Sequence, residues 1–460
     1  MSTTATKTEQ ARAWGRSFLK ELQNRLGVTK REDLLVLSTN TDPFAMGTKT
    51  HYERARWFAD VFEKFGHPGL HVRGVHYNIV GNPLLFWDGT PYENHKDSWK
   101  RLVEASRYAR ILGLVDPDIF EDKRNVMYEH AESYEPQHKE VNFEPGTFSA
   151  QASISFELPS VYTSRLYAEN AYQPVHVEIW SEKSRTDRVA LPIARQYGVN
   201  YRRGTGYLSI TYARDFVDKL VECGKPGVIL YLSDFDPAGD NMPRSAARHI
   251  EYKIAEQLRL NGTYNIHARV VPVALTQQQV ADLQLPPVML KEKTMKSFVE
   301  RLGVDVGAEI DALEARHPGK LRTLIIKELE KYRDPDMTRK IAEYNTAAEG
   351  RRDDLARALR DEFGKQLDAL ENEVHTLREK YKLDELEEEL QALDIGDKID
   401  DISRAMHDFF NEHIDDFEAP DLPVFSAPLV PQKDDPGVLY DSQREYTEQL
   451  WYYNNAQRKR

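Results

Sequence analysis

Two stretches decide the fold: PVHVEIWSEK at residues 174–183 and GVILYLSDFDPAGD at residues 227–240. Each begins as an apolar, β-rich run and ends in acidic residues. A third run of this kind, NIHARVVPVAL, covers residues 265–275, and helical stretches separate the three. Strands that alternate with helices predict right-handed crossovers and a parallel sheet covered on both faces. We therefore expect an α/β domain in the middle of the chain.

Acidic residues follow two of these predicted strands. Glu182 comes after the first run, and Asp234 and Asp236 come after the second. In an open parallel sheet, ligands gather beyond the carboxyl ends of the strands, so these side chains are expected at one edge. Three carboxylates that converge repel one another unless a cation lies between them, and hard oxygen ligands suit Mg²⁺. Asp240 follows in the same segment, and the sequence leaves open whether it is a ligand of the metal or a bystander.

A basic stretch lies between the two acidic segments. Residues 183–214 hold seven Lys and Arg side chains and one acidic residue, Asp187. The stretch includes a glycine-containing turn at residues 203–207, whose backbone N–H groups could approach an anion. Binding of a DNA backbone would explain this positive charge. The alternative explanation is a solvated helix face with no ligand. The candidate phosphate or DNA contacts are Lys183, Arg202, Arg203, Gly204, Gly206 and Arg214.

A tyrosine in a predicted helical module is the candidate nucleophile. The sequence LHVRGVHYNIV at residues 70–80 places Arg73 and Tyr77 four residues apart, as neighbours on one helix face. A phenol has a pKa of about 10, so it needs cationic surroundings or a base to act as a nucleophile. Arg73 and a metal from another domain could provide them. Taken alone, a tyrosine in this setting is more often structural, and His76 fits an interior histidine.

The motif lies in the second of three short predicted helices, and each of these helices is followed by a glycine. The predicted helices end at Gly66, Gly81 and Gly113, where glycine readily adopts the left-handed cap conformation. Three short helices followed by a charged turn suit a helix-turn-helix or winged-helix module. An ordinary helical subdomain explains the same pattern equally well.

Charge is distributed unevenly along the 460 residues. The chain has 62 basic and 75 acidic residues, a net charge of −13, yet residues 361–420 alone hold 20 acidic and 6 basic residues. This segment therefore accounts for the whole imbalance, and the total does not exclude DNA as a partner. A 3-4-3-4 spacing within it predicts a coiled-coil seam in a long hairpin or a dimer-contact arm. The seam comprises Leu367, Leu370, Val374, Leu377 and Tyr381. We expect an arm held away from the duplex, or a mimic that competes with it.

Several classes of protein are disfavoured by what the sequence lacks. Cys223 is the single cysteine, so neither a disulfide framework nor a cysteine zinc site can form within the chain. The first residues lack the apolar core of a signal peptide, and no stretch approaches 18 apolar residues. There is also no GxxxxGK[ST] phosphate loop. We expect a soluble cytoplasmic protein with no membrane partner and no ATPase site of its own.

The two constellations, in this order, resemble the A subunit of DNA topoisomerase VI and its relative, the meiotic double-strand-break protein. The family motif R-x-[aliphatic]-[aromatic]-Y matches residues 73–77, apart from histidine at the fourth place. Glu182-Lys183 and residues 234–239 match the two motifs of its Toprim domain, and residues 309–313 look like its E-L-D-A-L segment. The resemblance covers about residues 50–335. Asp240 and the acidic C-terminal third depart from the family pattern, which indicates a shortened bacterial, plasmid or phage relative.

The resemblance implies a multidomain α/β protein that cleaves DNA. Tyr77 would attack a phosphodiester and become linked to the DNA, while Glu182, Asp234 and Asp236 hold Mg²⁺ against the phosphate. Arg73 would help to bind that phosphate. The resemblance also implies a nucleoid-associated homodimer in which the tyrosine of one protomer works with the metal site of the other. Its partners would be double-stranded DNA and a separate ATPase subunit.

Five regions follow from these patterns. They are an N-terminal arm (1–45), a winged-helix domain with the tyrosine (46–145), a Toprim domain with a Rossmann-like parallel sheet and an extension (146–340), an acidic helical or coiled-coil arm (341–418), and an extended tail with a terminal helix (419–460). Two other functions stay open. The first is a Toprim nuclease, for example in defence against foreign DNA, that hydrolyses DNA without a covalent intermediate. The second is a non-catalytic DNA-binding scaffold whose arm recruits partners.

Overall fold

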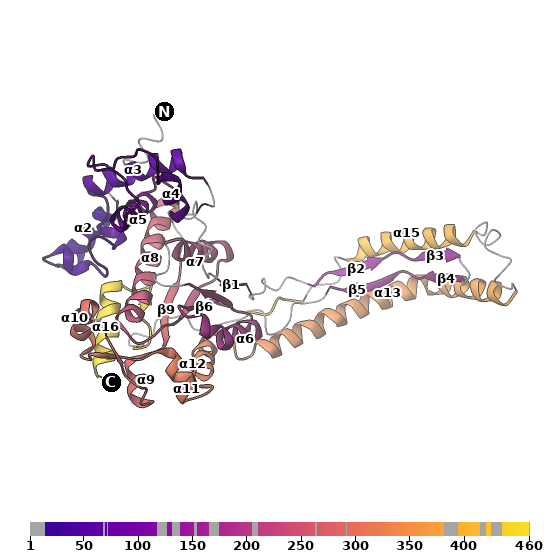
Figure 1. Cartoon of the computed structure of the whole chain (residues 1–460). Helices are drawn as coiled ribbons and strands as arrows, with labels where there is room; N and C mark the ends of the chain where they lie inside the picture. Colours follow the sequence, from indigo (N-terminus) through magenta and orange to yellow (C-terminus); the bar gives the residue numbers. More distant parts are fainter. Residues whose placement is uncertain are drawn as a thin grey trace. The chain divides into compact units, whose positions relative to one another are not determined.

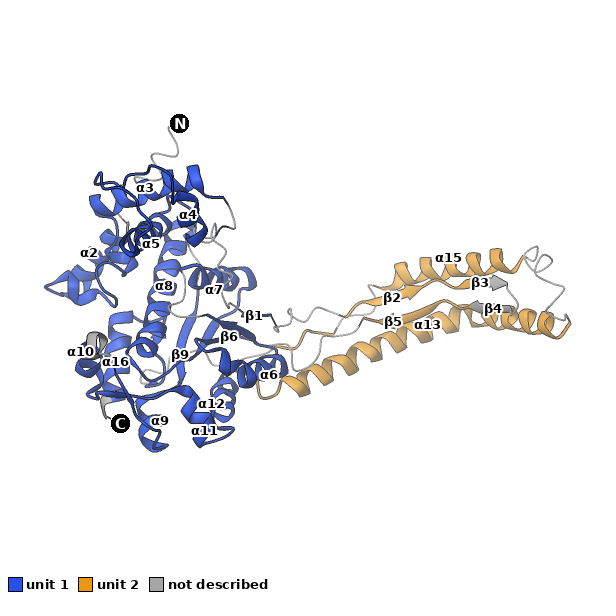
Figure 2. Cartoon of the chain, in the orientation of Figure 1, with its two compact units in different colours: residues 1–132, 173–333, 427–460 blue, residues 133–172, 334–426 orange. Residues whose placement is uncertain are grey.

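The computed structural model of the chain divides into two compact units (Figure 2). Unit 1 comprises residues 1–132, 173–333 and 427–460, and unit 2 comprises residues 133–172 and 334–426. The structure describes residues 14–67, 70, 72–116, 127–130, 139–150, 154–164, 174–204, 210–262, 265–290, 292–380, 394–414, 420–424 and 435–459. Within these residues, no helix is both long and apolar enough to cross a membrane.

A six-stranded sheet forms the centre of unit 1, in the order β1-β7-β6-β8-β9-β12 (Figure 1). The strands are β1 (Met127–Glu129), β6 (His176–Ser181), β7 (Asn200–Arg203), β8 (Gly227–Leu232), β9 (Ala268–Ala274) and β12 (Tyr440–Asp441). The four inner strands are parallel, and β1 and β12 pair antiparallel at the two edges. The three predicted strands and their parallel arrangement are confirmed, within a sheet that is mixed overall.

Helices cover both faces of this sheet, which explains why every residue of β6 and β8 is buried. Val177 and Ile179 of β6 face a core that includes side chains of α6 and α12. Trp180 faces the opposite core, formed with α7, α8 and α16. The elements outside the sheet are η4 (Ser184–Thr186), α6 (Asp187–Tyr197), α7 (Ile210–Cys223), α8 (Pro237–Asn261), α9 (Gln277–Asp282), β10 (Val288–Met289), α10 (Glu292–Leu302), β11 (Val306–Gly307), α11 (Ile310–Arg316), α12 (Lys320–Leu329), η5 (Glu330–Tyr332) and α16 (Tyr446–Lys459).

The three helices predicted near the candidate tyrosine are present in unit 1 (Figure 1). They are α3 (Lys49–Phe65), α4 (Val72–Ile79) and α5 (Lys96–Ile111), and they share one apolar core. An isolated bridge between Leu85 and Pro91 closes a small turn between α4 and α5. The helical character of this region is confirmed.

Residues expected in an N-terminal arm pack against the rest of unit 1. This part contains α2 (Trp14–Leu26), η1 (Arg31–Leu34) and η2 (Pro43–Ala45). Asp42 is fully buried and accepts backbone N–H groups of Val36, Leu37 and Phe44. It also pairs with the equally buried Arg248 of α8, at 3.0 Å. The described part of the segment is therefore held to α8 by a buried ion pair.

The C-terminal tail also joins unit 1. Its terminal helix, α16, is present as predicted, and β12 adds an edge strand beside β9. Asp441 of β12 forms an ion pair with Arg269 of β9 at 2.8 Å. Tyr440 and Tyr446 are buried in the core beneath α8 and meet edge to face. The chain end thus completes the sheet as well as forming a helix.

Unit 2 combines two long helices with two antiparallel strand pairs (Figure 2). The helices are α13 (Met337–Lys380) and α15 (Ile395–His413), and β2 (Val141–Glu144) pairs with β5 (Ser160–Thr163), as β3 (Thr147–Ala150) does with β4 (Ile154–Glu157). Leu367, Leu370 and Val374 of the predicted seam are buried, and Leu377 packs beside them. Tyr381 lies outside the described residues.

The seam of α13 packs within the chain against α15 and the strand pairs. Val141 and Val161 lie in the same cluster as Leu359 and Met406, so the strand segment is part of the core of unit 2. This grouping differs from the expected ranges, which placed residues 146–172 with the α/β region. The physical reason is the apolar face of β2 and β5, which needs the helices to cover it.

Candidate functional site

The predicted carboxylates lie at the carboxyl ends of neighbouring strands. Ser181 and Leu232, the last residues of β6 and β8, are in register. The backbone N–H of Glu182 donates to the carbonyl oxygen of Leu232 at 3.3 Å. Burial raises the pKa of Glu182, and the negative charges of Asp234 and Asp236 raise it further, against an opposing effect of Lys183. The three carboxylates are therefore close enough to influence one another.

Asp234 is held between a backbone group and a lysine. Its side chain is buried, and Oδ1 accepts the N–H of Ile310, the first residue of α11, at 2.8 Å. Oδ2 pairs with Lys183 Nζ at 2.7 Å. The hydrogen bond to Asp234 raises the pKa of Lys183, which keeps this ammonium group charged. Both carboxylate oxygens therefore have partners.

Asp236 caps the helix that follows β8. Its Oδ1 accepts the N–H of Gly239 at 2.7 Å, which satisfies one of the free donors in the first turn of α8. Pro237 stands at the first helical position, as is common there. A Cβ at Gly239 would lie 2.0 Å from the carbonyl oxygen of Asp234, so only glycine fits. The DxDPxG pattern thus describes a tight strand-to-helix turn that fixes both aspartates.

The donor set is suitable for Mg²⁺. Burial is the main cause of the raised pKa of Glu182, and a divalent cation would compensate the second cause, which is the negative charge of Asp234 and Asp236. Mg²⁺ is usually held by one or two carboxylates, with waters and phosphate oxygens completing an octahedron. Among the described residues, no three His, Cys, Asp or Glu side chains form a ready-made coordination group. If Mg²⁺ binds here, Glu182, Asp234 and Asp236 are the residues that would hold it, and waters and phosphate oxygens would have to complete its coordination.

Asp240 takes part in ion pairs and is not placed as a ligand. Its two oxygens accept from Arg244, at 3.2 Å, and from Arg301 of α10. Burial opposes its ionisation, but these arginines hold the pKa of Asp240 below the usual range. Arg244 continues to Asn454 of α16 at 2.8 Å. The Asp240 carboxylate therefore links α8 to α10, and Arg244 links α8 to α16.

Most of the basic stretch is neutralised by acids that the sequence does not place beside it. Arg202 is 4% exposed, and it pairs with Asp215 at 3.1 Å and with Glu178 at 3.5 Å. Its guanidinium also lies over the rings of Tyr128 and Tyr212. Arg202 is thus enclosed by protein and is not placed to contact a DNA phosphate.

The other predicted anion contacts behave in a similar way. Arg203 pairs with Asp187, and Arg214 pairs with Asp218 at 3.3 Å and Asp116 at 3.6 Å. The buried Gly204 donates its N–H to the carbonyl oxygen of Ser181 at 3.0 Å. Gly206 lies outside the described residues. Lys183 is the predicted contact that the structure brings to the carboxylates.

A fully buried glutamate holds the paired arginine in place. Glu178 of β6 is 0% exposed and accepts from His176, Trp180 and Tyr128. Lys219 of α7 lies 3.5 Å from it and also bonds to the hydroxyl of Tyr128. The sequence signal was present, because His176, Glu178 and Trp180 alternate on one face of an otherwise apolar strand. The polar cluster ties β1, β6, β7 and α7 together.

Replacing Glu178 by glutamine should destabilise the fold by about 3 kcal/mol, because the change leaves buried positive charge without its counter-ion. The measurement is urea unfolding followed by the fluorescence of tryptophan, since Trp180 is part of the cluster. Glu222→Gln, an exposed change in α7, is the control and should alter stability by less than about 0.5 kcal/mol. Equal stability of the two variants would show that the cluster is not a stabilising element.

The polar cluster around Glu178 also predicts that the stability of the fold depends on pH. Burial alone would raise the pKa of Glu178, but Arg202, His176 and Lys219 outweigh it and hold the pKa well below the usual range. The stabilisation is therefore complete above the unfolded-state pKa of about 4.3 and is lost as the pH falls below it. The difference in stability between the parent and Glu178→Gln should shrink by about 1.4 kcal/mol per pH unit below that point. A difference independent of pH would contradict the role of the ionised form.

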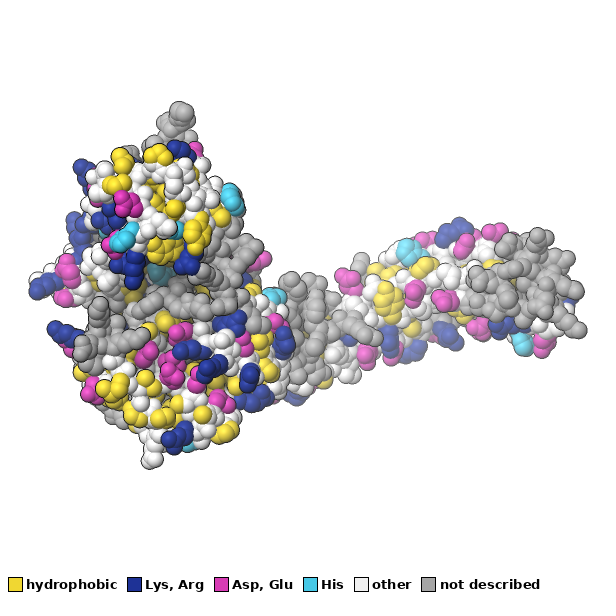
Figure 3. Space-filling model, in the orientation of Figure 1, with side chains coloured by type: hydrophobic (Ala, Val, Ile, Leu, Met, Phe, Trp, Pro, Cys, Tyr) yellow, Lys and Arg dark blue, Asp and Glu magenta, His cyan; other side chains and the backbone are white. Residues whose placement is uncertain are grey.

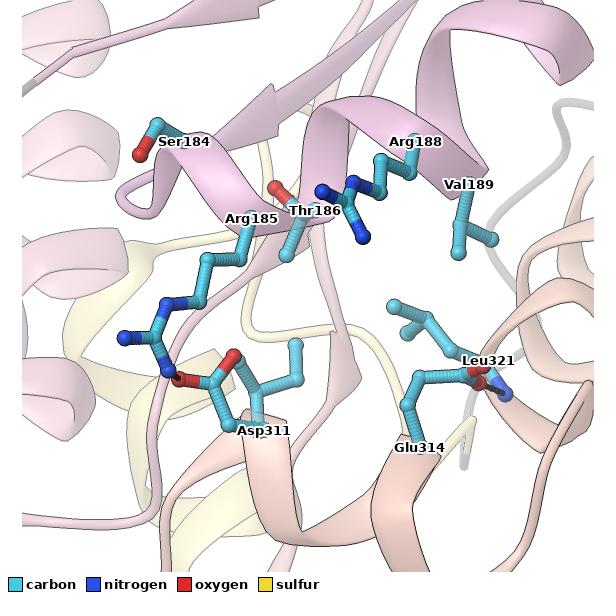
Figure 4. Close-up of a pocket in the computed structure, with 9 residues that line it drawn as sticks. Ser184, Arg185, Thr186, Arg188, Val189, Asp311, Glu314 and Leu321 are labelled. Atoms are coloured by element: carbon cyan, nitrogen blue, oxygen red, sulfur yellow. Dashed lines mark hydrogen bonds and ion pairs between the residues drawn. The ribbon is translucent and has the colours of Figure 1, made fainter.

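A hollow of about 670 Å³ is lined by residues of η4, α6, α11 and α12 (Figure 4). Its wall includes Ile310, whose N–H binds Asp234. Arg185 pairs with Asp311 across it at 2.7 Å, Arg188 reaches into it, and Glu314 accepts the N–H groups of Gly319 and Leu321. Basic and acidic side chains mingle over the region of α6 and α12 in Figure 3. The hollow therefore combines apolar side chains with side chains of both charges.

Tyr77 projects from α4 and is 66% exposed. On the same helix, the guanidinium of Arg73 lies 5.5 Å from the ring centre of Trp99. His76 is buried, and its Nδ1 shares a hydrogen bond of 2.6 Å with the hydroxyl of Tyr92, as expected for an interior histidine. Within the described part of the chain, Tyr77 makes no hydrogen bond to Glu182, Asp234 or Asp236. The tyrosine is therefore accessible to a partner molecule.

No protein-family model matches the chain, and no curated protein sequence matches it.

Proposed function

We propose that the protein is a Mg²⁺-dependent DNA-cleaving protein similar to the topoisomerase VI A subunit, acting through a tyrosyl-DNA intermediate. One observation carries the proposal: Glu182, Asp234 and Asp236 lie at the ends of two adjacent parallel strands, fixed by a DxDPxG turn. In this proposal the sheet region is a Toprim domain, and α3, α4 and α5 belong to a winged-helix domain. The exposed Tyr77 on α4 is the nucleophile.

The chemistry is a transesterification. The Tyr77 oxygen forms a bond to phosphorus, the bond from phosphorus to one DNA oxygen breaks, and the phenol proton passes to solvent while the leaving oxygen takes up a proton. Mg²⁺, when bound, supplies positive charge beside the phosphate. The three carboxylates hold the ion, and Arg73 binds the phosphate that Tyr77 attacks. Because one ester replaces another, the strand can be resealed without an external energy source.

The exposed tyrosine favours a composite site. Tyr77 is accessible and makes no hydrogen bond to the carboxylates of its own chain among the described residues, so a second copy is the natural source of the complementary metal site. We therefore propose a homodimer that acts on double-stranded DNA, with the tyrosine of one protomer beside the carboxylates of the other. Strand passage would need a separate ATPase subunit, and nucleoid association would follow from DNA binding.

A hydrolytic nuclease is the second candidate. The observation that favours it is that Tyr77 makes no hydrogen bond to the carboxylates among the described residues, so water could replace the phenol as nucleophile. Tyr77 would then be a surface residue of α4, and the product would carry no protein. The two candidates share the metal site and differ in the attacking group.

One experiment separates these functions. The protein is incubated with supercoiled plasmid and Mg²⁺, with and without ATP, and stopped with detergent. Gels are then run before and after digestion with protease. Cut DNA that enters the gel only after protease treatment indicates the tyrosyl intermediate, and cut DNA that is unaffected by protease indicates hydrolysis. DNA binding without any cutting, unaffected by chelator, would indicate a scaffold and contradict both.

A further inference from the structure

Lys183 occupies a specific place among the carboxylates. Its Nζ lies 2.7 Å from Asp234 Oδ2, and its charge also interacts with Glu182 and Glu309. Its side chain is 35% exposed, whereas that of Asp234 is 6% exposed. The ammonium group therefore lies at the mouth of the site, over a carboxylate that water barely reaches.

The two partners of Asp234 differ in their freedom to move. Oδ1 is bound by the N–H of Ile310, whose side chain is buried in the core, so this bond is fixed by the fold. Oδ2 is bound by a flexible lysine chain with a path to solvent. A cation that takes Asp234 as a ligand therefore competes with Lys183 for Oδ2 and can leave Ile310 in place.

We propose that Lys183 is a built-in counter-ion of the metal site, which neutralises Asp234 in the metal-free chain and moves to a DNA phosphate when Mg²⁺ takes the carboxylate. The inference rests on the proposed function, because it assigns a role in the same site. Lys183 is a positioning residue here, since it acts on the reaction through Asp234 and the DNA backbone. The lysine and Mg²⁺ compete for one oxygen.

Competition between Lys183 and Mg²⁺ predicts the direction in which removal of the lysine changes Mg²⁺ binding. Without Lys183, nothing positive has to leave Asp234, and the remaining carboxylates attract a divalent cation more strongly. With Mg²⁺ in place, the displaced ammonium group becomes available to a phosphate. Removal of the lysine should therefore strengthen Mg²⁺ binding and weaken DNA binding in Mg²⁺. A lysine that merely supports the fold would weaken both or change neither.

The test is calorimetric titration of Mg²⁺ into the full chain without DNA. Lys183→Gln should lower the Kd for Mg²⁺ by about tenfold. Lys183→Arg, which keeps the charge, should stay near the parent value. Lys331→Gln is the matched control, because Lys331 also pairs with a carboxylate, Glu328, at 2.7 Å, and it should change nothing. Circular dichroism confirms that each variant is folded.

DNA binding provides the second measurement, made in a Tyr77→Phe background so that no DNA is cut. In Mg²⁺, Lys183→Gln should weaken binding and reduce the slope of affinity against salt by about one contact. In chelator, Lys183→Gln should change DNA binding little, because in the parent Asp234 then holds the lysine in an ion pair. Equal or weaker Mg²⁺ binding by Lys183→Gln overturns the inference even if the parent cleaves DNA. Tighter Mg²⁺ binding in a parent that never cleaves DNA would instead contradict the proposed function alone.

Discussion

Asparagine in place of Asp234 should lower the rate of DNA cleavage in Mg²⁺ by about a thousandfold or more, as expected when a metal ligand worth several kcal/mol of transition-state stabilisation is lost. The change is chosen to spare the fold. The side-chain oxygen of asparagine can still accept the N–H of Ile310, which is the bond that Asp234 Oδ1 makes. Only the charge that pairs with Lys183 and would bind Mg²⁺ is removed.

Cleavage and binding must be measured separately for this variant. DNA retardation in chelator should be at least as strong as that of the parent, because no contact with the backbone is lost and the change releases Lys183 from its ion pair. Asp282→Asn, which replaces a carboxylate that accepts a hydrogen bond from Gln278 in α9, is the control and should cleave normally. If Asp234→Asn cleaves DNA as fast as the parent, the metal site has been assigned to the wrong residues.

The arrangement of the carboxylates was predictable from the sequence, because local patterns determine it. Apolar runs followed by Glu182 and by Asp234-Phe235-Asp236 place the acids at strand ends, and adjacent parallel strands bring strand ends together. The glycine of DxDPxG marks the tight turn, where Gly239 passes against the carbonyl group of Asp234. A short pattern and one rule of topology were sufficient.

The count over the basic stretch was misleading, because some partners of its arginines follow it directly in sequence and others come from distant parts of the chain. A count over residues 183–214 indicates strong positive charge, yet Arg202 pairs with Glu178 and Asp215, and Arg214 with Asp218 and Asp116. Each of these acids lies outside the counted stretch. Local charge therefore overstated the positive surface, and Lys183 is the predicted cation that the structure places beside the carboxylates.

Long-range packing explains the other differences. The sequence prediction divides residues 141–163 between the winged-helix and Toprim regions, and only the folded chain places them against α13 and α15. The tail reads as an extended segment and a helix, and the pairing of β12 with β9 depends on the Arg269–Asp441 ion pair and the buried Tyr440. Contacts between segments so far apart leave no periodic signal in either segment.

Phenylalanine in place of Tyr77 should abolish the covalent complex between protein and DNA. The phenol oxygen is the attacking atom, so its removal leaves nothing to bond to phosphorus, whereas the ring and its place on α4 are unchanged. Because the side chain is 66% exposed, the loss of the hydroxyl should not alter stability. Tyr162→Phe, at an exposed tyrosine of β5 in unit 2, is the matched control and should retain the complex.

Trapping of that complex is the most direct measurement of the central claim. Radiolabelled DNA is incubated with the full chain and Mg²⁺, denatured with detergent, and run on a protein gel beside the Tyr77→Phe and Tyr162→Phe variants. The account predicts label that migrates with the parent and with Tyr162→Phe, and none with Tyr77→Phe or in chelator. Label that still migrates with Tyr77→Phe, or DNA that the parent cuts without any labelled protein, would contradict a tyrosyl intermediate at Tyr77.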